Sequence, residues 1–227
     1  SVESRPQFAH TVVMRDRSYS PIDHLIVNFD QALRTLAGRP LVTGRPNPAD
    51  DREEAELSEA EKVESARLMR VNHAGEVAAQ ALYQGQALTA RLENVRDRME
   101  HAAEEENDHL DWCEKRINEL DGHVSYLNPL WYAGSFAIGA VAGALGDKWS
   151  LGFVAETEKQ VIKHLDGHLQ TLSASDQKSR AIIEQMKIDE AHHGAEAKRA
   201  GGVELPQPAK KLMKVVSKVM TGSAYWV

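Results

Sequence analysis

The sequence predicts an all-α fold in which four long helices form a bundle. After about residue 56, apolar residues recur at helical spacing through most of the chain, and no segment alternates in the manner of a strand. Asp121-Gly122 and Gly201-Gly202 end two of the predicted helices. Of the 227 residues, 42% are hydrophobic and 27% are charged, a balance that allows a soluble domain with a sizeable core.

Residues 1–55 are expected to form an N-terminal extension that precedes the bundle. A short amphipathic helix is predicted over Ile22 to Leu36, because apolar side chains repeat there at helical spacing. The stretch from Gly38 to Asp51 is rich in proline, glycine and charge, and is expected to be a loop or tether. Ser1 to His10 lack the apolar run of a secretory signal, so we expect a cytosolic chain.

The bundle domain is expected over residues 56–227. Its first helix should span about Glu59 to Ala90, because Ser58 and Glu61 have the spacing of a capping box. Three more long helices are predicted, followed by a short lysine-rich helix at the end of the chain. These helices span about residues 95–120, 148–172, 176–200 and 208–220.

The segment that joins the second and third long helices carries no charged residue. No Asp, Glu, Lys or Arg occurs between Asp121 and Asp147, and Leu127 to Leu145 is apolar. Its length alone is compatible with a transmembrane helix. In a four-helix bundle this stretch, about residues 122–147, is instead a long crossover connection.

A repeated pattern of glutamate and histidine is the most informative feature of the chain. Each half of the bundle reads Glu, and then Glu-x-x-His after 30 residues in the first half and 32 in the second. Positions i and i+3 lie on nearly one face of a helix, so each Glu-x-x-His pair can bind one metal centre. A gap of this size returns the chain to the same level on an antiparallel neighbour. The six residues are Glu76, Glu106, His109, Glu158, Glu190 and His193.

This ligand set is typical of the ferritin-like di-iron and di-manganese carboxylate proteins. Four carboxylates offset the charge of two divalent ions, and carboxylate with imidazole favours iron or manganese. Three alternatives stay open. The run from Glu104 to Glu106 is also what a charged surface looks like, Glu156 competes with Glu158, and His192 competes with His193.

Several motifs in the chain match a known enzyme family. They are Arg70-Val71-Asn72-His73-Ala74-Gly75-Glu76, Tyr83-Gln84-Gly85-Gln86, Glu106-Asn107-Asp108-His109-Leu110, Asn128-Pro129-Leu130-Trp131 and Glu190-Ala191-His192-His193. Together they resemble the demethoxyubiquinone hydroxylases of ubiquinone biosynthesis, in a bacterial form. The resemblance covers the chain from about Ser58 to its end. It implies a di-iron monooxygenase that uses O2 to hydroxylate the ring of a polyprenyl demethoxyquinol, with an electron donor that the sequence does not identify.

The resemblance also implies a role for each ligand. Glu76 and Glu158 would be the terminal carboxylates, and Glu106 and Glu190 would be the bridging ones. His109 and His193 would be the imidazole ligands, so that each chain holds two Fe ions. One departure is Lys159, where family members often have a second acidic residue.

Three further residues are expected near the ligands. Tyr83 should face the interior, for packing or for contact with substrate. Asp108 either orients an imidazole or faces water. His164 matches a family histidine near the site, where it either packs in the core or gates the substrate.

A peripheral membrane location follows from the metal prediction. A span through residues 127–145 would place the two half-sites on opposite sides of a bilayer. The segment is therefore expected to expose an apolar face to membrane or to a partner, with burial inside the domain or in a homo-oligomer as the alternative. The lysine-rich helix would attract anionic lipid. We expect the chain on the cytoplasmic face of a bacterial inner membrane, where a ubiquinone-biosynthesis protein is a further candidate partner.

Composition excludes several other classes of protein. A net charge of −7 and an aromatic content of 6% argue against nucleic acid as a partner. The single cysteine, Cys113, excludes an internal disulfide and a cysteine-ligated iron–sulfur cluster. The competing interpretations are an iron store or manganese catalase on the same fold, and a non-enzymatic membrane-associated helical lipid-binding protein.

Overall fold

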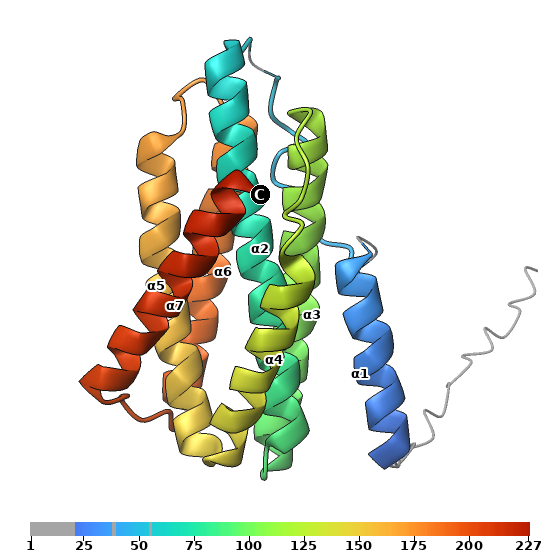
Figure 1. Cartoon of the computed structure of the whole chain (residues 1–227), viewed down its shortest axis with the longest axis vertical. Helices are drawn as coiled ribbons and strands as arrows, with labels where there is room; N and C mark the ends of the chain where they lie inside the picture. The colour runs from blue at the N-terminus through green and yellow to red at the C-terminus, as the bar shows by residue number, and fades with distance from the viewer. Residues whose placement is uncertain (1–20, 38–39, 55) are drawn as a thin grey trace, which may run out of the picture.

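The computed structural model describes residues 21–37, 40–54 and 56–227, and within these ranges every regular element is a helix (Figure 1). The first 20 residues, where the sequence indicates no secretory signal, lie outside the described part. The helices are α1 (Pro21–Leu36), α2 (Glu59–Thr89), α3 (Glu93–Glu119), α4 (Asn128–Ala144), α5 (Asp147–Thr171), α6 (Gln177–Arg199) and α7 (Gln207–Trp226).

The predicted four-helix bundle is made by α2, α3, α5 and α6. Figure 1 shows α4 lying along the bundle as the crossover, α7 crossing it obliquely and α1 standing to one side. The helix bounds agree with the predicted ones to within about two residues, except that α7 continues to Trp226 and does not stop near residue 220. The all-α prediction is confirmed.

Local capping explains why α2 begins where the sequence predicts. The Ser58 hydroxyl accepts from the Glu61 backbone N–H, and the Glu61 carboxylate accepts from the Ser58 N–H at 2.9 Å. Glu61 also accepts from Ser173 at 2.7 Å, which ties the start of α2 to the turn between α5 and α6. The capping box therefore fixes both the helix start and one contact between the two halves of the bundle.

Two large apolar clusters make up most of the core, beside two smaller ones. One large cluster surrounds Met69 and Ile117, and the other surrounds Met99 and Leu151. The buried glutamates and histidines of the predicted metal site come from helix positions between these clusters. Packed apolar layers above and below thus hold the polar layer at mid-bundle and keep water from it.

Close packing of α4 on α2 depends on glycine. A Cβ atom added at Gly139 would overlap the backbone of Leu82, and one added at Gly85 would overlap the backbone of Phe136. The helix axes can approach only because neither residue has a side chain. This contact explains how an uncharged helix with three glycines serves as the crossover.

Replacing Gly139 by alanine is expected to lower the free energy of unfolding by about 1–3 kcal/mol, because the new methyl group must push two backbones apart. Chemical denaturation of the metal-free protein measures this. The matched control is Gly134→Ala on the same helix, where a Cβ meets no atom within 4 Å. A neutral or stabilising result at both positions would contradict the close-packing interpretation.

In the described part of the chain, no helix is both long and apolar enough to pass through a bilayer. The crossover helix α4 instead packs on α2 and α5. Its outward side exposes Leu130, Ile138, Val141 and Leu145.

The loop before the bundle, residues 40–54, is attached to the bundle and is here called the strap. Ala49 is buried in the cluster around Met69, and the Glu54 carboxylate accepts from the Arg116 guanidinium at 2.9 and 3.0 Å. Of the two alternatives for this stretch, a loop or a tether, the structure shows a loop that packs against the bundle. Its proline and charge content predicted irregular backbone correctly, but the charged side chains pair with groups on the bundle.

Candidate metal centre

Four of the predicted ligands meet in the middle of the bundle. Glu76 comes from α2, Glu106 and His109 from α3, and Glu190 from α6, and one donor atom from each lies within 4.8 Å of the others. Nδ1 of His109 is 3.0 Å from Glu106, 3.3 Å from Glu190 and 3.6 Å from Glu76. All four side chains are buried, so the group is shielded from water.

The other two predicted ligands lie on the far side of the same carboxylates. Nδ1 of His193 is 3.3 Å from Glu190 Oε2 and 3.6 Å from Glu106 Oε1. Glu106 and Glu190 therefore each place one oxygen beside His109 and the other beside His193. Glu158, buried on α5, accepts from the Tyr83 hydroxyl and is close enough to Glu190 to interact with it.

The geometry separates the competing candidates. His192 is 60% exposed and pairs with Glu196, whereas His193 is buried among the carboxylates. Glu156 pairs with Lys210 at 3.6 Å, away from the cluster. Glu104 is exposed, although it neighbours buried residues in the same acidic run.

Two acidic residues that sequence reasoning did not select contact the histidines. Nε2 of His109 lies 2.9 Å from Asp189 of α6, and Nε2 of His193 lies 2.5 Å from Glu105 of α3. Each acid directly precedes the glutamate of one Glu-x-x-His pair and reaches the histidine of the other pair. A carboxylate on the second ring nitrogen fixes the tautomer and orientation of a metal-binding imidazole. The signal in the sequence was an acidic residue before each pair.

Asp108 does neither of the two things expected of it. Its side chain is buried and accepts from the backbone N–H of Thr43 at 2.8 Å, from the Thr43 hydroxyl and from Arg45 at 2.8 Å. It therefore binds the strap, and it neither faces water nor contacts an imidazole through any hydrogen bond of the described residues. The contacts of the strap with the bundle could not be predicted from the sequence, because the residues that it binds are far away along the chain.

Tyr83 and His164 lie on the inner side of the helices. Tyr83 is buried and donates to Glu158, as an inward-facing residue should. The ring of His164 lies 4.0 Å from the ring of His168, edge to face. His164 Nε2 is buried and has no hydrogen-bond partner among the described residues.

When no metal ion is bound, burial and neighbouring charges favour the protonated forms of several side chains in this cluster. Burial, together with the charge of Glu106, raises the pKa of Glu76 well above its usual value, and burial with the charge of Glu190 does the same for Glu158. For His193, burial opposes the charged form, but hydrogen bonds to Glu105 and Glu190 outweigh it and raise the pKa to about 11. Metal ions that bind Glu76, Glu158 and His193 would therefore replace protons whose binding these shifts favour.

Metal affinity is therefore expected to rise with pH. Because the pKa values of Glu76, Glu158 and His193 are raised, the structure favours the protonated form of each group, and a bound cation must displace that proton. We expect the logarithm of the ferrous affinity to increase by about one per pH unit for each proton displaced. Anaerobic titrations at several pH values, with proton release followed in a pH-stat, measure this. Affinity that is constant from pH 6 to about 9 would contradict the assignment.

The residues present fit a buried metal site. Glu106 Oε1 is buried without a hydrogen-bond partner among the described residues, so this oxygen is free to bind a cation. The donors are carboxylate oxygens and imidazole nitrogens, which suit iron or manganese. Sharing each of two carboxylates between both imidazoles is the arrangement that a bridged pair of ions requires.

Residues 63–224 match the protein family described as ubiquinone biosynthesis protein COQ7. The chain belongs to the COQ7 family. It is 62% identical over 214 residues to the 3-demethoxyubiquinol 3-hydroxylase of Nitrosococcus oceani, covering 94% of this chain and 100% of that protein. It is also 61% identical over 206 residues to the 3-demethoxyubiquinol 3-hydroxylase of Nitrosospira multiformis, and this alignment covers 91% of this chain and 99% of that protein.

A solved structure confirms the fold of this COQ7-family chain. A thioferritin, the bacterioferritin-related protein of Bacteroides fragilis, aligns with a TM-score of 0.51 and 19% identity, covering 63% of this chain and 86% of the thioferritin. At this identity the likeness concerns the fold alone. The prediction of a ferritin-like bundle is confirmed.

Proposed function

We propose that this chain is a di-iron 3-demethoxyubiquinol 3-hydroxylase, a monooxygenase that uses O2 to hydroxylate the ring of a polyprenyl demethoxyquinol. The observation that carries the proposal is that two buried carboxylates shared between two imidazoles lie beside an apolar cavity. The relatives named above support the reaction. The proposed ligands of two iron ions are Glu76, Glu106, His109, Glu158, Glu190 and His193.

The cavity fits a substrate with a polar ring and an apolar tail. Its volume is about 290 Å³, and it lies between α2, α4, α5 and α7. At its inner end are Glu76, Glu158 and Glu190, and its walls are mostly aliphatic and aromatic. The apolar wall residues include Val71, Ala79, Leu82, Ile138, Phe153, Val161, Leu212, Met213 and Val216.

The protein side chains have separate tasks in this reaction. A bound pair of reduced irons supplies the activation of O2. The apolar wall excludes water and holds the quinol ring against the ligand layer. His164 lines the cavity, and its unpartnered Nε2 is available to bind a ring hydroxyl. Tyr83 holds Glu158 in place by its hydrogen bond.

The competing functions fit the cavity less well. Iron storage and manganese catalysis act on small polar species, which need no apolar chamber at the metal site. A lipid-binding protein without catalysis would need the chamber but not the buried, convergent ligands. The electron donor, and any partner that presents the quinol, are not identified by the structure.

To test the proposal, the purified chain is loaded with ferrous iron and given a short-chain demethoxyquinol, a chemical reductant and isotopically labelled O2. We expect one labelled oxygen atom in the hydroxylated ring, and about two irons per chain. Whole-cell quinone profiling after deletion should show accumulation of the demethoxy compound. A normal quinone profile, or iron loading far above two per chain, would reject the hydroxylase assignment.

We also propose that the chain binds the cytoplasmic face of the bacterial inner membrane through α4 and α7, the helices that flank the cavity. Leu212, Val215 and Val219 are exposed on α7, near the exposed apolar side chains of α4. Lys211, Lys214 and Lys218 are exposed on the same helix, and would attract anionic headgroups. A quinol could then pass from the bilayer into the cavity without crossing water.

Flotation with anionic vesicles tests the membrane proposal. Val215→Glu with Val219→Glu should abolish flotation, because two carboxylates would enter the interface. Ile188→Glu is the matched control, since Ile188 is equally exposed but lies on α6. Failure of the unchanged folded protein to float, or equal loss in both variants, would refute the assigned surface.

A further inference from the structure

We infer that Arg45 of the strap positions the proposed metal ligand His109, so that the strap helps to set the geometry of the metal centre. This inference rests on the proposed function, because it takes His109 to bind iron. Arg45 itself lies outside the family match, which covers residues 63–224.

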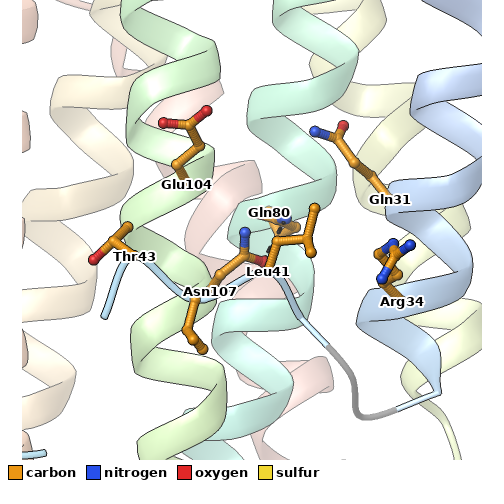
Figure 2. A pocket seen from close by; sticks show the side chains of 8 residues that line it. Gln31, Arg34, Leu41, Thr43, Gln80, Glu104 and Asn107 are labelled. Atoms are coloured by element: carbon orange, nitrogen blue, oxygen red, sulfur yellow. Dashed lines mark hydrogen bonds between the residues drawn. The ribbon is translucent and has the colours of Figure 1, made fainter. Parts of the chain in front are cut away.

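The strap crosses the bundle next to the ligand layer. Figure 2 shows Thr43 beside α3 and Leu41 near Gln80 of α2, where they line a cavity of about 290 Å³ that is also lined by Gln31 and Arg34 of α1. Thr43 binds Asp108 of α3 through both its backbone N–H and its hydroxyl. These bonds place the next strap residues against α3 at the level of Asp108, which directly precedes His109.

Arg45 joins two helices at this point. Its Nε donates to Asp108 on α3 at 2.8 Å, and its Nη1 donates to Asp189 on α6 at 2.9 Å. The guanidinium also lies 5.0 Å from the centre of the Trp112 ring, and that ring is 5.4 Å from the His109 ring. A planar guanidinium that donates to two carboxylates fixes both of them in direction.

The chain of contacts ends on His109. Asp189 Oδ2, the oxygen that accepts from Arg45, is also the oxygen 2.9 Å from His109 Nε2. Asp189 is only partly exposed, and Gln185 donates to its other oxygen, Oδ1, at 2.9 Å, so Arg45 is the group that holds the oxygen facing the His109 ring. Arg45 also offsets the charge that Asp108 and Asp189 bring close together.

Arg45 supports the orientation of only one of the two proposed imidazole ligands, His109. His193 is held by Glu105, and within the described residues Arg45 donates hydrogen bonds to Asp108 and Asp189 but not to Glu105. The strap should therefore affect the iron bound by His109 much more than the iron bound by His193.

The experiment compares Arg45→Met, Asp189→Asn and the double variant in the full chain. Ferrous affinity is measured by anaerobic competition with a chelator, and the two iron environments are compared by Mössbauer spectroscopy. We expect Arg45→Met to weaken the affinity about tenfold, in line with the effects of outer partners of metal ligands. One of the two iron signals should change. The double variant should be no weaker than Asp189→Asn alone, because both changes act on the same bond.

Arg52→Met is the matched control, because it makes the same exchange at an exposed arginine of the strap and leaves Thr43, Arg45 and Asp189 unchanged. It should bind iron like the unchanged chain. If Arg45→Met does not fold, Arg45→Lys is used, since one ammonium cannot reproduce the planar bridge and the same direction of change is expected. Wild-type affinity and spectra in Arg45→Met, equal losses in Arg52→Met, or losses that multiply in the double variant would overturn the inference. Failure of the unchanged chain to bind iron would instead reject the proposed function.

Discussion

Replacing Glu106 by alanine is expected to abolish quinol hydroxylation and most iron binding. Glu106 places one oxygen 3.0 Å from His109 and the other 3.6 Å from His193, so its loss removes a donor from both proposed iron positions. Removing a residue that only hydrogen-bonds to a metal ligand already lowers metal affinity or activity by about 10–100-fold. Loss of a ligand shared by both iron positions should cause a larger decrease. Bound iron and turnover are measured on the same preparation.

The variant should nevertheless fold. Glu106 lies in a buried group with three other carboxyls, and removing one of several like charges does not expose a new unpaired charge. Denaturation of the metal-free proteins checks this point. Glu104→Ala is the control from the same acidic run, and its exposed side chain predicts normal iron content. If Glu104→Ala and Glu106→Ala behave alike, the run is a solvated surface and the metal assignment is lost.

Replacing Gly75 by leucine is expected to separate quinol turnover from iron binding. Gly75 lines the apolar cavity next to Glu76, and a Cβ added there meets no atom within 4 Å. The leucine side chain should therefore fit the helix but occupy the space proposed for the quinol ring. Displacing a substrate by about 1 Å can cost 100-fold, so we expect at least about that loss in kcat/KM. Iron content and the oxidation of bound ferrous iron by O2 should persist.

Stability gives a second signature of this variant. Gly75 lies inside α2, where exchange of glycine for leucine favours the helix by about 0.5–1 kcal/mol. The variant should thus be inactive yet at least as stable as the unchanged chain. Gly167→Leu, at an exposed and equally open position of α5, is the control and should keep full turnover. Normal hydroxylation by Gly75→Leu would show that the ring binds elsewhere.

The helices and the residue types of the site were readable from the sequence because they depend on local rules. The capping box at Ser58 and the apolar repeat set the start and length of α2. The Glu-x-x-His spacing depends only on the turn of one helix, and its repetition depends only on helix length. The loop character of residues 40–54 was also local, since proline, glycine and charge disfavour regular structure.

Tertiary structure alone decided which groups meet across helices. The contact between Asp189 and His109, and that between Glu105 and His193, depend on the rotation and axial register of α3 against α6. No single helix encodes that register, so in the sequence both acids resemble ordinary surface charges. The role of Arg45 depends on a loop that returns across many residues to Asp108 and Asp189, where burial makes pairing of the charges necessary. The chain itself thus specified its helices and its ligand types, and packing specified which imidazole each outer carboxylate holds.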